Sequence, residues 1–296
     1  MKLLHLKVVL VAVDSDESAL DTLRSASEFA RTAGASLHVV HVTTLGRPVR
    51  AQPSRESTEC DPWSLFESAG LPANEIRLHL IAGEPVHVIR SLADKIRADV
   101  IVLGRHRGRP ALGKEMGSTA LGVVNNSWAP CLILAGAMRL PLERVLVPVD
   151  LSRTSRGALV VGLSWASALR GTRALAGSAS DDTVSLRALL VERLDSSAAD
   201  FNERALDEEL DRLRRDAGSW ANVTIDCAVV ANSDVPRAIA DYATDEHADL
   251  IVFGTRGLGQ DAIGRLGSVS LGVARRVATP LLLVPPAVWN AYASTS

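Results

Sequence analysis

The chain repeats one segment of its own sequence, and this repeat limits the folds that are open to it. At an offset of 150 residues, the segment ADVIV at 98–102 aligns with ADLIV at 248–252. The same register continues without a gap from 104–132 to 254–282, with glycine, serine, leucine and proline at matched positions. Self-similarity of this kind indicates a repeated structural unit, so we expect two copies of one fold.

The beginnings of the two copies also match, at an offset of 136 residues. Residues 8–14 and 144–150 are both apolar runs that end in an aspartate. The two offsets differ because the second copy contains extra residues, which the alignment places mostly near 173–182. We therefore expect two domains, 1–138 and 143–288, each built on the same plan.

Within each copy, short apolar runs alternate with helical patterns. The runs are rich in Val, Ile and Leu, as expected of strands that are buried on both faces. Strands that alternate with helices predict an α/β fold with a doubly wound parallel sheet and right-handed crossovers. Residues 43–60 are expected to form a loop, with a short helix around 61–70. The other helices are predicted at 18–32, 85–96, 118–125, 154–169, 202–217, 236–246 and 268–277.

Composition excludes several classes of protein. The chain is 47% hydrophobic and 22% charged with a net charge of −2, which gives no basic surface for nucleic acid or anionic membranes. No apolar run is long enough to span a bilayer, and the N-terminal run predicts a strand rather than a signal peptide. The three cysteines form no CxxC pair, which favours a reducing compartment. By elimination, we expect a cytoplasmic protein.

The second copy carries a glycine pattern at a junction between a strand and a helix. Gly254 and Gly257 are followed, after nine residues, by Gly267 and Ser268. Glycine allows a close approach of the backbone to a ligand, and the amides of a helix N-terminus attract an anion. The spacing therefore predicts a phosphate-binding loop, although a plain loop with tight turns and an N-capping serine would use the same residue types.

The first copy departs from this pattern in the middle of the loop. Gly104 and the pair Gly117–Ser118 are kept, but Arg107 stands where the second copy has Gly257, and Ala120 replaces Ser270. A side chain at position 107 can block a phosphate, whereas the cations of 105–107 can bind one. Both interpretations of the first copy stay open.

An aspartate ends the first strand of each copy, namely Asp14 and Asp150. In an open α/β sheet, ligands bind beyond the carboxyl ends of the strands where the strand order reverses, so each aspartate is expected to face its glycine loop. The carboxylate then accepts hydrogen bonds from ribose hydroxyls, or it caps the helix that follows. A metal site is not expected, because His38 and His41 point to opposite faces of a strand.

These motifs together resemble the universal stress protein family, in the form of two such domains in tandem. The resemblance implies five-stranded sheets in the order 3-2-1-4-5, as in the adenine nucleotide alpha hydrolases, with dimer-like packing of two units. It also implies an ATP site with the aspartate at the nucleoside, a residue of the second strand at the base and the glycine loop around the phosphates. The residues carried over are Pro148, Asp150, Val191, Gly254, Arg256, Gly257, Gly267, Ser268, Val269 and Ser270, and in the first copy Asp14, Val42, Gly104, Gly117, Ser118 and Thr119.

The expected function is that of an ATP-binding stress or regulatory protein that holds the nucleotide, with or without Mg²⁺, mainly in the second domain. No lysine precedes Ser268 as in a P-loop and no GxSxG motif is present, so we expect no dedicated enzyme and only slow ATP hydrolysis at most. The alternative is an interaction module that dimerises without a nucleotide. An ATP-using ligase ranks last, because its Ser-Gly-Gly-x-Asp-Ser loop is missing. An intramolecular pseudo-dimer and a homodimer are the expected assemblies.

Overall fold

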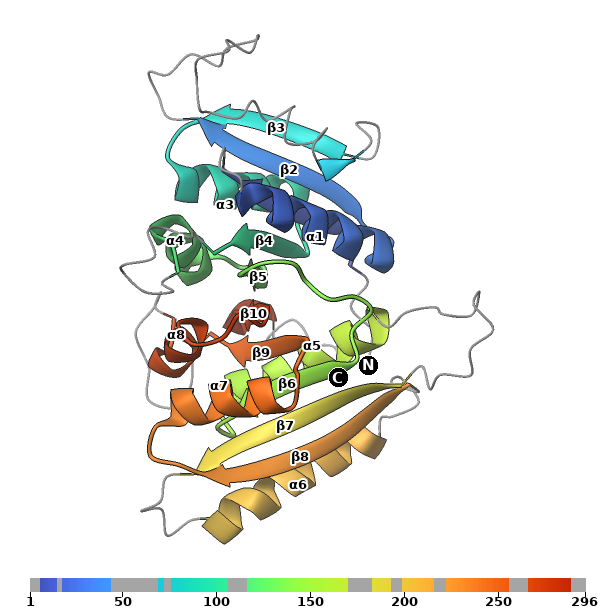
Figure 1. Ribbon diagram of the computed structural model, residues 1–296, viewed down its shortest axis with the longest axis vertical. Coiled ribbons are helices and arrows are strands. Elements are labelled where there is room, and N and C mark those ends of the chain that lie inside the picture. Colours follow the sequence, from blue (N-terminus) through green and yellow to red (C-terminus); the bar gives the residue numbers. More distant parts are fainter. Residues whose placement is uncertain are drawn as a thin grey trace. The chain divides into compact units, whose positions relative to one another are not determined.

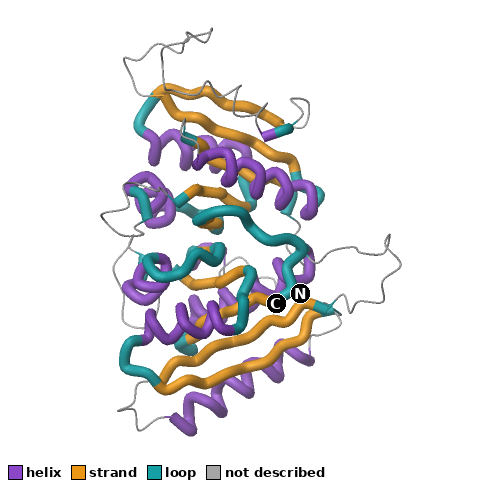
Figure 2. The backbone as a smooth tube through the Cα atoms, viewed as in Figure 1, coloured by secondary structure: helices purple, strands orange, loops and turns teal. Residues whose placement is uncertain are grey.

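The computed structural model describes residues 6–14, 18–43, 69–71, 76–105, 116–169, 183–192, 199–215, 222–255 and 266–288. They divide into two compact units, one within 6–138 and the other within 139–288. Figure 2 shows strands and helices in each of them. The predicted loop at 43–60 and the short helix around 61–70 lie almost wholly outside the described residues.

The first unit alternates strands and helices around a parallel sheet. Its strands pair in the order β3-β2-β1-β4-β5 (Figure 1). The elements are β1 (Val8–Val13), α1 (Ser18–Ala33), β2 (Ser36–Thr43), β3 (Ile76–Ala82), α3 (Pro85–Ile96), β4 (Val100–Gly104), α4 (Ser118–Asn126) and β5 (Cys131–Leu134).

The second unit repeats this plan, with its strands paired in the order β8-β7-β6-β9-β10. The predicted α/β fold with a parallel sheet and flanking helices is therefore confirmed. The elements are β6 (Arg144–Val149), α5 (Arg153–Ala168), β7 (Val184–Glu192), α6 (Ala199–Arg215), β8 (Val223–Ala231), α7 (Val235–Asp245), β9 (Leu250–Gly254), α8 (Ser268–Ala274) and β10 (Leu281–Val284). Within the described segments, no helix has the length and apolar character needed to cross a membrane.

The central strands of each unit are covered on both faces. All residues of β5 and β10 are buried, and so are the first four of β4 and β9. Helix α1 buries one stripe at helical spacing, including Leu23, Ala26 and Phe29. The connection from β1 to β2 through α1 crosses the sheet in the opposite direction to the connections through α3 and α4. Because such connections are right-handed, α1 lies on the opposite face of the sheet from α3 and α4. The sheet is therefore wound on both sides.

A carboxylate, buried in the second unit and half-buried in the first, fixes the beginning of the first strand in each unit. Asp249 accepts hydrogen bonds from the backbone N–H groups of Glu143 and Arg144, each at 2.9 Å. In the first unit, Asp99 accepts from Lys7 at 2.7 Å and from the next residue of the strand at 2.9 Å. The repeated Ala-Asp pair that revealed the internal repeat is thus a structural feature that aligns β4 with β1 and β9 with β6.

The glycines of the two Leu-Gly-Val segments allow neighbouring helices to approach each other. A Cβ on Gly122 would lie 2.6 Å from Val86 Cγ2, and one on Gly272 would lie 2.8 Å from Pro236 Cβ. These contacts join α4 to the start of α3 and α8 to the start of α7, which lie side by side (Figure 1). The sequence motif therefore serves helix-to-helix packing rather than chemistry.

Candidate functional site

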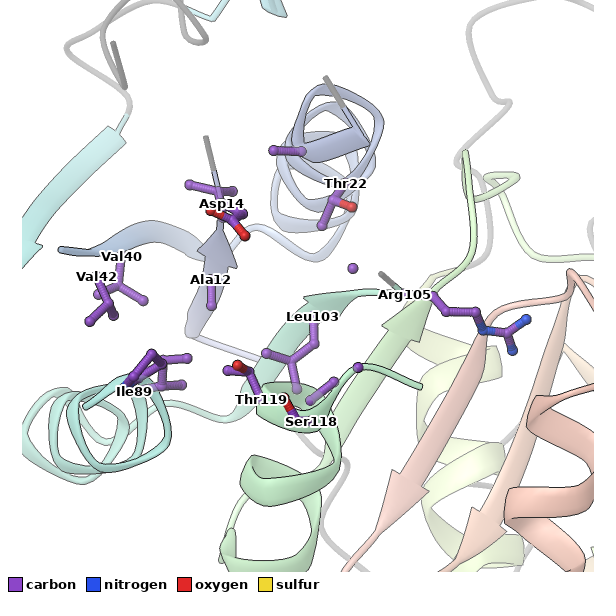
Figure 3. A pocket seen from close by; sticks show the side chains of 16 residues that line it. Ala12, Asp14, Thr22, Val40, Val42, Ile89, Leu103, Arg105, Ser118 and Thr119 are labelled. Carbon is purple, nitrogen blue, oxygen red and sulfur yellow. The ribbon is translucent and has the colours of Figure 1, made fainter. Parts of the chain in front are cut away.

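The first unit contains a cavity of about 260 Å³ beyond the carboxyl ends of its strands. It lies where β1 and β4 are neighbours, which is the point at which the order of the strands reverses. Strand ends from β1, β2 and β4 and the first turns of α1, α3 and α4 enclose it (Figure 3).

One side of this cavity is apolar and the other is polar. Val40, Val42 and Ile89 lie on the apolar side, and Ala12 and Leu103 belong to the two central strands (Figure 3). The polar groups are the Asp14 carboxylate and the hydroxyls of Thr22, Ser118 and Thr119. An apolar surface with a few converging polar groups suits a flat heterocycle linked to a sugar.

All six residues carried over to the first copy line this cavity, although they are far apart in the sequence. They are Asp14, Val42, Gly104, Gly117, Ser118 and Thr119. The structure therefore brings them together around one space. Their roles as ligand contacts stay a prediction.

The cationic residues of the first loop are only partly described. Burial lowers the pKa of the Arg105 guanidinium, and Figure 3 shows this side chain pointing away from Asp14 and Thr22. Arg105 is among the residues that line the cavity, and its contact with a phosphate stays a prediction. His106 and Arg107 lie outside the described residues.

In the second unit, Asp150 ends β6 as predicted, and its carboxylate serves the local turn. Asp150 Oδ1 accepts a hydrogen bond from the N–H of Ser152 at 3.1 Å. Leu151 between them has a φ of 59°, and Ser152 Oγ then caps α5 by accepting from the N–H of Ser155 at 3.2 Å. Asp150 therefore shapes the turn before α5, whereas the N-cap of this helix, a role that the sequence left open for the aspartate, is Ser152.

The glycine signature of the second unit is described at both ends but not in its middle. Gly254 ends β9, and Gly267 lies directly before α8, where its N–H donates to Thr255 O at 3.1 Å. Ser270 Oγ donates to Gly267 O at 3.0 Å, which closes the first turn of α8. Ser268 is exposed and Val269 is half-buried. Pro148 is buried in β6, and Val191 near the end of β7 is half-buried. Arg256 and Gly257 lie outside the described residues.

The two glycines that end β4 and β9 are both needed for close packing. A Cβ on Gly104 would lie 2.7 Å from Thr22 Oγ1, and a Cβ on Gly254 would lie 2.7 Å from the carbonyl oxygen of Thr154. Gly267 is different, because the nearest atom to its Cβ would be Ser270 Oγ at 3.5 Å. The first glycine of the signature therefore has a packing reason in both copies, independent of any ligand.

A histidine pair on β2 and β3 was not foreseen from the sequence. His38 Nδ1 lies 3.0 Å from His79 Nε2, and the two rings stack at a centroid distance of 5.2 Å. Burial, followed by the charge of the partner histidine, lowers the pKa of His38. Burial also lowers the pKa of His79, with Lys95 and Arg77 adding to the effect. Only the register between the two strands brings these residues together.

Within the described residues, little supports a reactive cysteine or a bound metal ion. Burial raises the pKa of the Cys131 thiol to about 12, so this side chain stays protonated at neutral pH. Among the residues whose positions are described, no group of three or more His, Cys, Asp or Glu side chains could hold a metal ion.

The repeated fold and its two junctions between strand and helix match a known family. The model of the universal stress protein family matches residues 5–135 and again residues 141–285. The chain belongs to the universal stress protein family. It carries two of the family's domains in tandem, as the resemblance implied.

Known proteins resemble the chain over one or both of its units. Universal stress protein A homolog 1 of Coxiella burnetii is 28% identical over 153 residues, which cover 46% of this chain and 99% of the relative. A universal stress protein structure from Archaeoglobus fulgidus has a TM-score of 0.63 and 20% identity, covering 94% of this chain and 96% of its own. A functionally unknown protein from Pseudomonas aeruginosa has a TM-score of 0.61 and 12% identity over 98% of each chain. At these identities the two structures support the fold alone.

Proposed function

We propose that this universal stress protein binds an adenine nucleotide and acts in a regulatory or stress-response role, without being a dedicated enzyme. The observation that carries the proposal is the cavity of the first unit, at the point where the strand order reverses. Its apolar side suits the base, and the Asp14 carboxylate suits the ribose hydroxyls.

The nucleotide in this proposal is ATP, with or without Mg²⁺. The phosphate-binding pattern of Gly254, Gly257, Gly267 and Ser268 supports a triphosphate in the second unit, as the sequence predicts. Gly104, Gly117 and Ser118 supply three of the four positions of the same pattern in the first unit. The intact pattern favours the second unit as the main site, whereas the cavity favours the first unit.

Binding without efficient turnover follows from the residues near the predicted phosphates. Leu266 precedes Gly267 and Ser268, so the position of the P-loop lysine has no cation. Without this charge, a leaving phosphoryl group would be stabilised only by Arg256, Arg265 or a metal ion. The proposal therefore includes slow ATP hydrolysis at most.

The assembly is part of the same proposal. Each unit forms a five-stranded sheet of its own, and the two units pair as an intramolecular pseudo-dimer, with a homodimer and a cytoplasmic location expected from the sequence. The alternative function is an interaction module that binds no nucleotide, and the replacement of the middle glycine by Arg107 is the feature that favours it.

A thermal shift measurement tests nucleotide binding directly. A ligand at 100 times its Kd stabilises the folded state by about 2.7 kcal/mol, so ATP with Mg²⁺ is expected to raise the melting temperature by several degrees. The matched variants Gly117→Trp and Gly267→Trp place a large side chain at the start of α4 or α8, and the variant that abolishes the shift identifies the unit. A wild-type protein that shows no shift with ATP, ADP or AMP contradicts the proposal and supports the interaction module.

A further inference from the structure

The stacked histidines of the first unit belong to a larger group of cationic side chains. In the register of β2 with β3, Arg77 lies opposite His38, and His79 follows two residues later on the same face of β3. Helix α3 packs on β2, and Lys95 in its last turn lies near enough to lower the pKa of His79. We call these four side chains the cationic cluster: His38, Arg77, His79 and Lys95.

The members of the cationic cluster differ in their exposure. His38 is only 5% exposed and His79 is half-buried, whereas Arg77 and Lys95 are exposed. The histidines therefore form the floor of the cluster, and two long flexible cations stand at its rim. Such side chains can turn toward a ligand that reaches the floor.

In the second unit, the matched place holds a cation that the chain itself neutralises. Arg187 takes the position of His38, because Ser185 and Ser36 pair with matched residues of the first strands. Its Nη1 donates to Tyr242 Oη at 3.0 Å and lies 2.9 Å from Glu246 Oε2 on the same helix α7. Asp226 lies opposite Arg187 in the register of β7 with β8.

The two units therefore carry opposite charges at the same place in the fold. The second unit has one cation among three carboxylate positions, whereas the first unit has four cationic or protonatable groups at or beside the same positions. The matched pairs are His38 and Arg187, Arg77 and Asp226, Leu92 and Tyr242, Lys95 and Asp245, and Ile96 and Glu246.

We propose that the cationic cluster of the first unit binds a phosphate dianion, either free or at the end of an organic monoester, which takes the place of the carboxylates of the second unit. A tetrahedral dianion accepts charge-assisted hydrogen bonds from a guanidinium, an ammonium and an imidazole at once. The site goes beyond the proposed nucleotide cavity. That cavity lies past the carboxyl ends of the strands, whereas the cluster lies toward the amino ends of β2 and β3 and the C-terminal end of α3.

Binding at this cluster is coupled to the protonation of the histidines. Burial and then neighbouring positive charge lower the pKa of both rings in the free protein. A dianion opposes the effect of these charges and raises the pKa of the rings, so each bound anion is accompanied by an uptake of protons. The affinity for the anion therefore increases as the pH falls.

NMR of the histidine ring signals in the full chain tests the site. Sulfate is the first probe, because it stays a dianion between pH 6 and 7.5, and chloride keeps the ionic strength constant. Sulfate is expected to shift the signals of His38 and His79 in a saturable way and to leave those of the exposed His87 unchanged. Its affinity is expected to increase by about 3- to 10-fold from pH 7.5 to 6. A wild-type chain without a saturable shift, or with an affinity that is independent of pH, overturns the proposal.

Charge-reversal variants separate a specific site from general attraction. The double variant Arg77→Asp, Lys95→Asp gives the first unit the residues of the second at two exposed positions, and it is expected to weaken sulfate by at least about 10-fold. The control Arg31→Asp, Arg153→Asp changes the net charge equally at exposed positions of α1 and α5, and it is expected to stay within about 2-fold of the wild type. Equal weakening in both double variants overturns the proposal.

Glu75 directly precedes β3 and lies outside the described residues, so the variant Glu75→Gln is included. Sulfate binding that appears only in this variant would show that a carboxylate of the chain already occupies the cluster, and it overturns the proposal. Inorganic phosphate and glycerol 3-phosphate at pH 7.5 then distinguish the two sources of the ligand. Tighter binding of the first supports a site for free phosphate, and tighter binding of the second supports a site for a monoester.

Discussion

At the scale of single residues, the glycines of the signature have different tasks. A Cβ on Gly254 would lie 2.7 Å from a backbone oxygen, which cannot turn aside as a side chain can. Gly267 has a φ of −61°, and a Cβ there would make only ordinary contacts, at 3.5 Å from Ser270 Oγ and 3.8 Å from Thr255 O, so neither packing nor backbone conformation requires a glycine. The first glycine of the pattern therefore has a packing role, whereas the last has none, and the phosphate contact of the last glycine stays a prediction.

This difference predicts unequal costs of adding one methyl group. Gly254→Ala is expected to lower the free energy of unfolding by about 1–3 kcal/mol, because the added Cβ forces the first turn of α5 away from β9. Gly267→Ala is the matched control and is expected to lower it by less than about 1 kcal/mol, since only the preference of an N-cap position is affected. Urea denaturation measures both, and equal losses in the two variants would argue against the packing role.

At the scale of elements, the sequence predicted the strands and helices well, since each rests on local periodicity that the repeat presents twice. Helix α3 was predicted with the same ends that the structure shows, whereas α8 ends three residues earlier than expected. The pairing of His38 with His79 could not be predicted. These residues are 41 positions apart in the sequence, and their contact depends on how β2 and β3 are aligned. Local pattern contains no information on that register.

The histidine pair predicts a dependence of stability on pH. The pKa of each ring is lowered in the folded protein, and Arg77 on β3 and Lys95 on α3 add positive charge near the pair. The unfolded chain therefore takes up protons first as the pH falls below the ordinary histidine value of about 6.5, and the stability contributed by the neutral pair is lost from there downward.

Melting temperatures between pH 7.5 and 5 measure this effect. The double variant His38→Val, His79→Leu is expected to lose less stability over this range than the wild type. His87→Gln, which changes an exposed histidine on α3, serves as the control and is expected to keep the wild-type profile. A double variant with an undiminished dependence on pH would show that other groups cause it.

At the scale of the whole molecule, two copies of one unit have kept the same order of strands and differ in the sequence that follows the fourth strand. The sequence indicated both sites through the aspartates and the glycines, and in the first unit the structure brings all six predicted residues around one cavity. The sequence favoured the second unit as the main site of the nucleotide, because the glycine signature of that unit is intact. The contact of Thr154 with Gly254 escaped that argument, because it arises only once α5 packs on β9.

The most direct measurement is a crystal structure of the full chain grown with ATP and Mg²⁺. The account predicts density for the base and ribose in the cavity of the first unit, with the ribose hydroxyls at the Asp14 carboxylate and the base near Val40 and Val42. Crystals that show no nucleotide density in the cavity at Asp14 would contradict this account.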